Sequence, residues 1–222
     1  MTKAALAYVR EHHLNDLTMR ELGRLVDATP MALYRHIGSK QDLARELTDI
    51  VLGSITIPED DVEAVAWLRE LAVETRQALL QYPGTADLLL DEGPSVLNAL
   101  RLLDRVIRRF QAEGMSVQQA TELHNTFFSW LAGFVRREVV WQRSSDGARG
   151  AMKLFRARAS ALPAEEFPGL AAAMPFLRAR DQETEFQASL TFMLEAVAAR
   201  LSAVRSARPS KRARKRTKSS GN

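Results

Sequence analysis

The sequence predicts an all-α protein, in which an N-terminal three-helix helix-turn-helix domain precedes a larger α-helical domain. Three observations support this fold class. Apolar residues recur at spacings of three and four along most of the 222 residues. Ser, Thr or Asp precedes many of these runs, and Gly or Pro follows them, as the starts and ends of helices require. No stretch alternates apolar and polar residues in the way that a half-buried strand does.

The most informative stretch, Leu17 to Lys40, reads LTMRELGRLVDATPMALYRHIGSK. Thr18 and Glu21 form a capping box, in which each side chain can satisfy a backbone N–H, so a short helix is expected to begin there. Thr29 then caps a second helix, with Pro30 at the first helical position, where a missing N–H does no harm. Two short helices joined by a three-residue turn have the geometry of a helix-turn-helix, whose second helix enters the major groove of DNA.

These residues resemble the TetR family of one-component bacterial transcription regulators. The resemblance rests on LTMRELGRLV, then MALYRH, then a Lys at position 40 that opens the next helix. Hydroxyl groups and a His ring suit phosphate oxygens, and Arg can reach guanine O6 and N7. The resemblance implies phosphate contacts from Thr18, Tyr34, His36 and Lys40, and an approach to base edges by Arg20, Thr29, Pro30, Met31, Ala32 and Arg35.

Two residues depart from the family pattern. Gly23 stands where the family usually has Ala, and Asp27 stands where it usually has the turn Gly. Asp tolerates left-handed backbone better than most residues, so we expect the turn to form, although a carboxylate near DNA is unfavourable. The competing hypothesis is a helical hairpin with ordinary caps and a buried tyrosine.

Composition narrows the class of protein. Hydrophobic residues make up 46% of the chain, which is typical of a globular protein with a real core. The chain has no cysteine, which excludes a disulfide framework, a thiol nucleophile and a Cys-based zinc site. No phosphate loop, HExxH or G-x-S-x-G pattern is present, so we predict no enzyme activity and no cofactor or metal. The chain has no signal-peptide h-region and no run of about 18 apolar residues, so we expect a cytoplasmic protein without a membrane span.

Charge is unevenly distributed along the chain. Residues 1–53 hold seven Lys or Arg and seven Asp or Glu, residues 54–204 hold 16 and 20, and residues 205–222 hold eight and none. We expect the last segment to be a disordered basic tail. Two hypotheses stay open for it: a solvated tail without a role, or a source of non-specific affinity for DNA phosphates.

The chain divides at Gly53-Ser54 into a helix-turn-helix DNA-binding domain, 1–53, and a helical ligand-sensing and dimerisation domain, 54–204. The first domain opens with a helix from Thr2 to His13, whose two terminal histidines are expected to be solvated. The order Pro83-Gly84-Thr85-Ala86, Gly93-Pro94 and a helix opening on Gly-Met-Ser resembles the C-terminal domain of tetracycline-repressor-like proteins. In this larger domain, helices are expected from Asp60 or Asp61 to 82, and over about 85–90, 95–113, 116–143, 148–161 and 181–204.

The helices over 116–143 and 181–204 are the candidates for a homodimer interface. The second of them carries an apolar stripe broader than one helix face needs. A palindromic operator requires two recognition helices about 34–36 Å apart, which a monomer does not supply. The alternative is that this helix only completes the core. The stripe consists of Phe186, Leu190, Met193, Leu194, Val197 and Leu201.

A pocket for a small-molecule effector is expected among apolar and aromatic side chains of the larger domain, because ligand sites in helical bundles have such linings. Core packing is the competing hypothesis for each aromatic residue. His124 is open between a satisfied core histidine and a ligand contact. The candidates are Trp67, Leu71, Leu89, Leu103, Ile107, His124, Asn125, Phe127, Phe128, Trp130, Leu131, Phe134 and Phe155.

Taken together, the resemblance implies a ligand-responsive transcriptional regulator, most simply a repressor that binds a double-stranded DNA operator as a homodimer and is released by a small molecule. An enzyme is disfavoured by the missing catalytic motifs. A helical interaction module without specific DNA binding is the remaining alternative.

Overall fold

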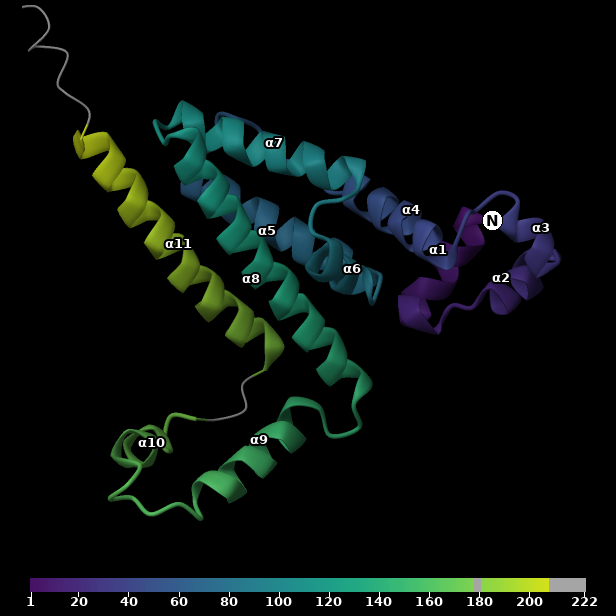
Figure 1. Ribbon diagram of the computed structural model, residues 1–222. Coiled ribbons are helices and arrows are strands. Elements are labelled where there is room, and N and C mark those ends of the chain that lie inside the picture. Colours follow the sequence, from purple (N-terminus) through teal and green to yellow (C-terminus); the bar gives the residue numbers. More distant parts are fainter. Residues whose placement is uncertain (178–180, 208–222) are drawn as a thin grey trace, which may run out of the picture.

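The computed structural model describes residues 1–177 and 181–207, and within these ranges the regular elements are helices without any strand. The prediction of an all-α fold is confirmed. Figure 1 shows α1 to α4 together at one end, a longer group made of α5 to α8 and α11, and α9 and α10 as an arm at the C-terminal end of α8. The helices are α1 (Thr2–Glu11), the 3₁₀ helix η1 (Leu14–Asp16), α2 (Met19–Val26), α3 (Pro30–Tyr34), α4 (Lys40–Gly53), α5 (Ala64–Gln81), α6 (Thr85–Glu92), α7 (Leu97–Ala112), α8 (Val117–Arg143), α9 (Gly147–Ala159), α10 (Pro168–Ala173) and α11 (Gln182–Ala207).

None of the helices in the described part of the chain has both the length and the apolar content that a bilayer span needs.

The two threonine caps that the sequence predicts form at the starts of α2 and α3, but the other half of the predicted capping box is wrong, because the Glu21 carboxylate pairs with Arg24 at 2.8 Å. The Thr18 hydroxyl accepts a hydrogen bond from the Glu21 N–H at 3.1 Å, and the Thr29 hydroxyl accepts one from the Ala32 N–H at 3.2 Å. Between α2 and α3, Asp27 adopts left-handed backbone with φ 51° and ψ 49°. Asp is one of the few residues other than Gly that tolerate this conformation, so the turn forms without the usual Gly.

Gly23, the second departure from the family pattern, is needed for the same turn. The Ala28 N–H donates to the Gly23 carbonyl at 2.9 Å, which folds the turn back onto α2. A Cβ atom at position 23 would lie 2.4 Å from the Ala28 carbonyl oxygen, so either the turn or the helix would have to move. The two departures are therefore linked, because Asp27 supplies the left-handed residue and Gly23 leaves room for the carbonyl that follows it.

The described residues form two hydrophobic cores, and α4 belongs to both. Leu43 and Leu47 lie in the first core, which is built from residues 5–47. Val51 and Leu52, one turn further on, lie in the second core, which extends to residue 201. The sequence suggests a domain boundary after Gly53. The last turn of α4, just before this boundary, already packs in the larger core.

Polar contacts join the two groups of helices on either side of α4. The Leu14 N–H donates to the Pro83 carbonyl at 2.8 Å. Asn98, at the start of α7, donates to Asp49 of α4 through its backbone N–H at 2.6 Å, and its side-chain amide donates to the Asp49 carbonyl at 2.9 Å. The two Asn98 bonds hold α4 against the first turn of α7, and the Leu14 bond joins η1 to the segment between α5 and α6.

The prediction of a solvated histidine at the end of the first helix is wrong for His13. The helix ends at Glu11, and His13 is half-buried, with Nε2 3.3 Å from the Asp87 carboxylate of α6. His12 is exposed. The η1 turn that follows α1 places His13 against the larger group of helices. The sequence argument considered only the favourable position of a histidine at a helix C-terminus, and it could not include this tertiary contact.

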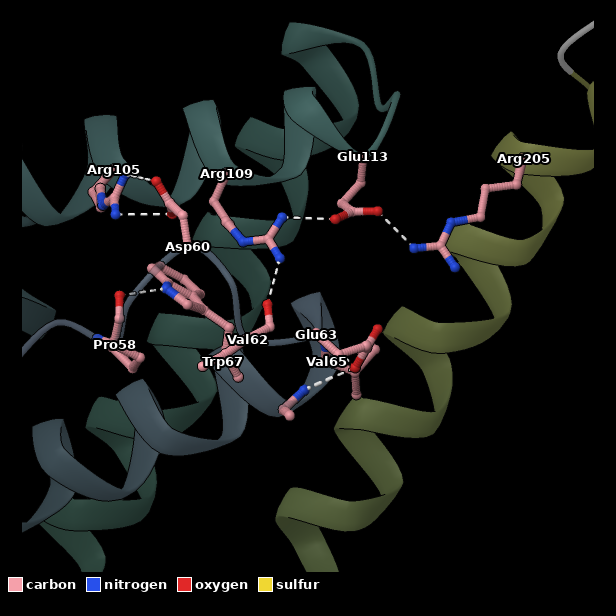
Figure 2. A network of polar contacts seen from close by, with 11 residues as sticks. Pro58, Asp60, Val62, Glu63, Val65, Trp67, Arg105, Arg109, Glu113 and Arg205 are labelled. Carbon is pink, nitrogen blue, oxygen red and sulfur yellow. Dashed lines mark hydrogen bonds and ion pairs between the residues drawn. The ribbon is translucent and has the colours of Figure 1, made fainter.

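The linker between α4 and α5 is held by side chains of α5 and α7 (Figure 2). The Trp67 indole N–H donates to the Pro58 carbonyl at 2.8 Å, and Asp60 pairs with Arg105 at 2.8 Å. Helix α5 begins at Ala64, so the expected start at Asp60 or Asp61 is wrong. Glu63 caps the helix instead, because its carboxylate accepts hydrogen bonds from the first free N–H groups.

The same network reaches the C-terminal helix (Figure 2). Arg109 donates to the Val62 carbonyl at 2.8 Å and pairs with Glu113 at 2.7 Å, and Glu113 pairs with Arg205 at 2.6 Å. Arg109, and after it Arg205, holds the pKa of Glu113 below its ordinary value. Helix α11 extends to Ala207, so the prediction that the disordered tail begins at Arg205 is wrong. The rest of the expected basic tail, from 208 onward, lies outside the described residues.

The apolar stripe of α11 packs inside its own subunit. Phe186, Leu190, Leu194, Val197 and Leu201 are all buried in the larger core, and Met193 is half-buried against it. The stripe therefore does not itself form a dimer face. Of the large apolar residues on the two candidate helices, Val117 and Val140 of α8 and Phe192 of α11 stay exposed, Phe192 to 73%.

Replacement of Gly23 by Ala is expected to lower the free energy of unfolding by about 1–3 kcal/mol, because the added methyl overlaps the Ala28 carbonyl. Urea unfolding followed by circular dichroism measures this loss. The control is Gly169→Ala in α10, where a Cβ meets nothing within 4 Å. It should leave stability unchanged or raise it by up to about 1 kcal/mol. Equal stability of the Gly23→Ala variant and the wild type would contradict the close approach.

Candidate DNA interface and effector cavity

Nine of the ten residues proposed to contact DNA are exposed, in the helix-turn-helix and at the start of α4. Leu33 and Ile37 are buried beneath α3, and this burial turns the opposite side of the helix outward. Met31 is 75% exposed and Tyr34 46% exposed, which is unusual for side chains of this size. Exposed residues of the proposed set are Thr18, Arg20, Thr29, Pro30, Met31, Tyr34, Arg35, His36 and Lys40, and Ala32 is half-buried.

Lys40 is exposed but engaged within the protein. Its ammonium group donates to the Asn15 carbonyl at 2.7 Å, which ties the start of α4 to η1. Thr18 and Thr29 also have a structural task, because their hydroxyl oxygens cap α2 and α3. Each capping hydroxyl accepts a hydrogen bond there and keeps its own O–H to donate.

A cavity of about 210 Å³ lies among α4, α5, α6, α7 and α8. Most of its lining is apolar, and the polar part consists of Thr75, His124, Asn125 and Ser129. None of the described lining residues is an acid, a lysine or an arginine. The complete lining is Leu52, Thr75, Leu79, Leu89, Leu90, Gly93, Pro94, Ala99, Leu102, His124, Asn125, Phe128, Ser129, Leu131 and Ala132.

The structure brings five of the proposed effector contacts into this cavity, namely Leu89, His124, Asn125, Phe128 and Leu131. The others lie elsewhere. Trp67, Leu71, Phe127 and Phe134 are buried in the larger core, and Trp130 packs on Phe127, Phe134 and Phe186. Leu103 and Ile107 are half-buried outside the lining, and Phe155 is exposed on α9.

Ten lining residues were not expected from the sequence. The sequence indicated some of them. Gly93 and Pro94 interrupt the helical structure between α6 and α7, and an irregular segment of this kind can leave space beside it. Thr75 is a polar residue on the buried face of α5. Small residues such as Ala99 and Ala132 gave no signal, because they line the cavity by leaving space rather than by filling it.

His124 is neutral at the cavity wall. Burial lowers its pKa below the ordinary value of 6.5, and a hydrogen bond with Asn125 opposes this shift. The imidazole Nδ1 lies 3.3 Å from the Asn125 side-chain oxygen, and the ring stacks on Phe128 at 4.7 Å between centroids. A neutral imidazole offers one donor and one acceptor, so it can bind a polar group of a ligand without carrying charge.

The cavity and the helix-turn-helix are joined by a short chain of contacts. Leu90, Gly93 and Pro94 line the cavity, and Glu92 lies between them in sequence. Glu92 accepts hydrogen bonds from Arg45 at 2.7 Å and from Gln41 at 2.6 Å, and both donors are on α4. Arg45 is the main cause that lowers the pKa of Glu92, so this carboxylate is charged at neutral pH.

Residues 58–201 match the family model described as the tetracyclin repressor-like C-terminal domain, which covers more than half of the chain. The chain belongs to the TetR family. A curated HTH-type transcriptional regulator of Saccharopolyspora erythraea is 25% identical to this TetR-family chain over 208 residues, covering 90% of it and 83% of the relative. The sequence-based prediction of a TetR-family regulator is confirmed.

Solved TetR-family structures share the fold. ActR of Streptomyces coelicolor, in complex with actinorhodin, superposes with a TM-score of 0.77 at 20% identity, over 90% of this chain and 95% of ActR. BioQ with its natural double-stranded DNA operator gives a TM-score of 0.58 at 26% identity, over 69% of this chain and 92% of BioQ. At such identities the ActR likeness shows the fold alone.

His124 is expected to make stability depend on pH. Its pKa is lower in the folded protein than the ordinary 6.5, so between these two values the unfolded chain binds more protons than the folded one. The free energy of unfolding therefore falls as the pH falls below 6.5. Urea titrations of the wild type and of His124→Gln should differ by a constant amount above pH 7 and converge toward acid. Parallel curves down to pH 5 would show that His124 does not titrate differently on unfolding.

Proposed function

We propose that this TetR-family chain is a repressor that binds a palindromic operator as a homodimer and leaves it when a small molecule fills the cavity among α4 to α8. The observation that carries the proposal is the position of α4. Its first turn follows the recognition helix, and its last turn brings Leu52 into the cavity lining. ActR in complex with actinorhodin and BioQ with its operator support the two halves of the proposal by analogy.

We assign DNA contact to the exposed surface of α2 and α3. Residues 1–53 carry equal numbers of acidic and basic residues, so a general positive field does not supply the affinity. Arg35 and Arg20 are the candidates for base edges, and Tyr34 and Thr18 for phosphates. Lys40 would first have to leave the Asn15 carbonyl to reach a phosphate.

The dimer follows from the operator geometry, because two recognition helices must be held about one helical turn of DNA apart. We propose that α8 and α11 form the interface. Support comes from the apolar residues that these two helices leave exposed, Val117, Val140 and Phe192, since the stripe of α11 is used inside the subunit.

Release would pass through the segment between α6 and α7. A ligand that displaces Gly93 or Pro94 moves Glu92, and Glu92 holds Arg45 and Gln41 of α4. Movement of α4 then changes the distance between the two recognition helices of a dimer. The proposed role is regulatory rather than catalytic, and a repressor of this kind acts in the cytoplasm, where the chromosome is.

Operator binding is tested by electrophoretic mobility shift on the DNA upstream of the chain's own coding sequence. Arg35→Ala is expected to cost about 1–3 kcal/mol of specific binding and to relax the base preference. Tyr34→Phe, which removes only a hydroxyl, should weaken binding to all sequences by about 1 kcal/mol. Arg149→Ala is the matched control, because Arg149 is exposed on α9, outside the helix-turn-helix. Equal loss in all three variants, or no shift at all, would contradict the proposal.

The contact between Glu92 and α4 is tested by Glu92→Ala. Without Glu92, α4 can take orientations that the operator does not fit, so operator affinity is expected to fall about fivefold, a modest loss because the pair with Arg45 is partly exposed. The control is Glu46→Ala, which removes a hydrogen bond from Thr2 within the N-terminal group only. If the Glu92→Ala variant binds the operator as tightly as the Glu46→Ala control does, Glu92 does not position α4.

A further inference from the structure

Met31 is the most exposed large apolar side chain of the N-terminal group of helices. It is 75% exposed, whereas the other large aliphatic side chains that stay exposed there, Met1, Leu25 and Ile50, reach at most 41%. A single exposed apolar side chain can be without consequence, so the surroundings of Met31 decide what it does. Its role is inferred on the basis of the proposed function, in which α3 enters the major groove of the operator.

The position of Met31 on α3 directs its side chain away from the protein. Met31 is the second residue of this helix, and the N-terminal residues of a recognition helix are those that contact base edges. Leu33 is 3% exposed and packs α3 onto the first core. Two helical residues are separated by about 200° around the helix axis, so Met31 projects from the side of α3 opposite this core.

Arg35 lies on the same side of the helix as Met31. Residues four apart are neighbours on one helix face, and Arg35 keeps helical backbone directly after the last residue of α3. Within the described residues the Arg35 guanidinium has neither a hydrogen bond nor an ion pair, unlike Arg24 of α2, which pairs with Glu21 at 2.8 Å. Four residues advance about 6 Å along the axis, so Met31 and Arg35 face base pairs about one or two steps apart.

A methionine side chain suits only one group in the major groove. The C5 methyl of thymine is the apolar group that base pairs present there, beside hydrogen-bond donors and acceptors. Methionine has no donor and only a weak sulfur acceptor, so against the polar edge of another base it displaces water without replacing the lost hydrogen bonds. Against a thymine methyl, the same contact removes apolar surface of both partners from water.

We propose that Met31 recognises a thymine in each half-site of the operator through its C5 methyl group, one or two base pairs from the guanine that Arg35 contacts. The unbranched thioether chain has the freedom to follow the methyl group across the floor of the groove. Specificity at this base pair comes from a hydrophobic contact, and specificity at the neighbouring guanine comes from hydrogen bonds.

The test is an electrophoretic mobility shift with the full chain on the duplex that it selects from a random pool. Each thymine of a half-site, together with its palindromic mate, is replaced in turn by deoxyuridine, which removes only the methyl group. We expect one replacement, within two base pairs of the guanine that Arg35→Ala ceases to distinguish, to weaken wild-type binding about fourfold per half-site, as burial of one methyl allows. Equal wild-type binding of all these duplexes, or a sensitive thymine farther from this guanine, contradicts the proposal.

Variants of Met31 assign the effect to this side chain. Met31→Ala is expected to bind the thymine and uracil duplexes equally, and Met31→Leu, of similar volume, should keep most of the preference. Leu154→Ala is the matched control and should keep the fourfold ratio, because Leu154 is 55% exposed on α9, outside the helix-turn-helix. A purely structural role of Met31 would weaken binding to both duplexes alike, so a ratio that Met31→Ala leaves intact contradicts recognition of the methyl group.

Failure of the proposed function gives a different result. A wild-type chain that selects no specific duplex overturns both the proposed function and the role of Met31. Specific binding that is insensitive to every thymine methyl overturns the role of Met31 alone.

Discussion

The burial of one helix in two hydrophobic cores is the constraint on which the rest of this protein depends. α4 has 14 residues and is about 21 Å long, and it is stiff over that distance. Leu47 is fully buried in the first core, and Val51, one turn later on the same face of the helix, is buried in the second. Neither end can slide without opening a cavity in a packed core, which costs several kcal/mol. The packing of the larger core therefore determines the orientation of the recognition helix, and a change in that packing changes this orientation.

The helix-turn-helix obtains its geometry from local chemistry rather than from a large core of its own. Thr18 stabilises the start of α2 by accepting from the Glu21 N–H, and its own hydroxyl hydrogen stays free for an acceptor outside the protein. An N-cap and a phosphate contact are compatible in one threonine for this reason. The turn between α2 and α3 likewise depends on local residues. Asp27 supplies the left-handed backbone, and Gly23 leaves room for the carbonyl group that approaches it.

Helix ends with strong local signals could be predicted from the sequence. Ser116 and Gln119 form a complete capping box, and α8 begins directly after Ser116, as expected. The start of α5 could not be predicted from the sequence. Asp60 is a suitable N-cap residue, but its carboxylate pairs with Arg105 of α7, a contact that the sequence does not reveal. The cavity was the hardest part. Periodicity tells which face of a helix is buried, but not whether that face meets another side chain or an empty space, so the aromatic residues of α8 divided between core and cavity in a way that only the packed structure reveals.

The fastened linker between α4 and α5 also has a consequence for how the molecule moves. Domains joined by a free linker usually reorient independently of each other. Here Pro58 and Val62 give their carbonyl groups to Trp67 of α5 and to Arg109 of α7, so the connecting chain has little slack. We therefore expect the DNA-binding and sensing halves to reorient together rather than independently. Within the described residues, release as proposed above is then expected to depend on a small displacement of α4 rather than on free reorientation of the two halves.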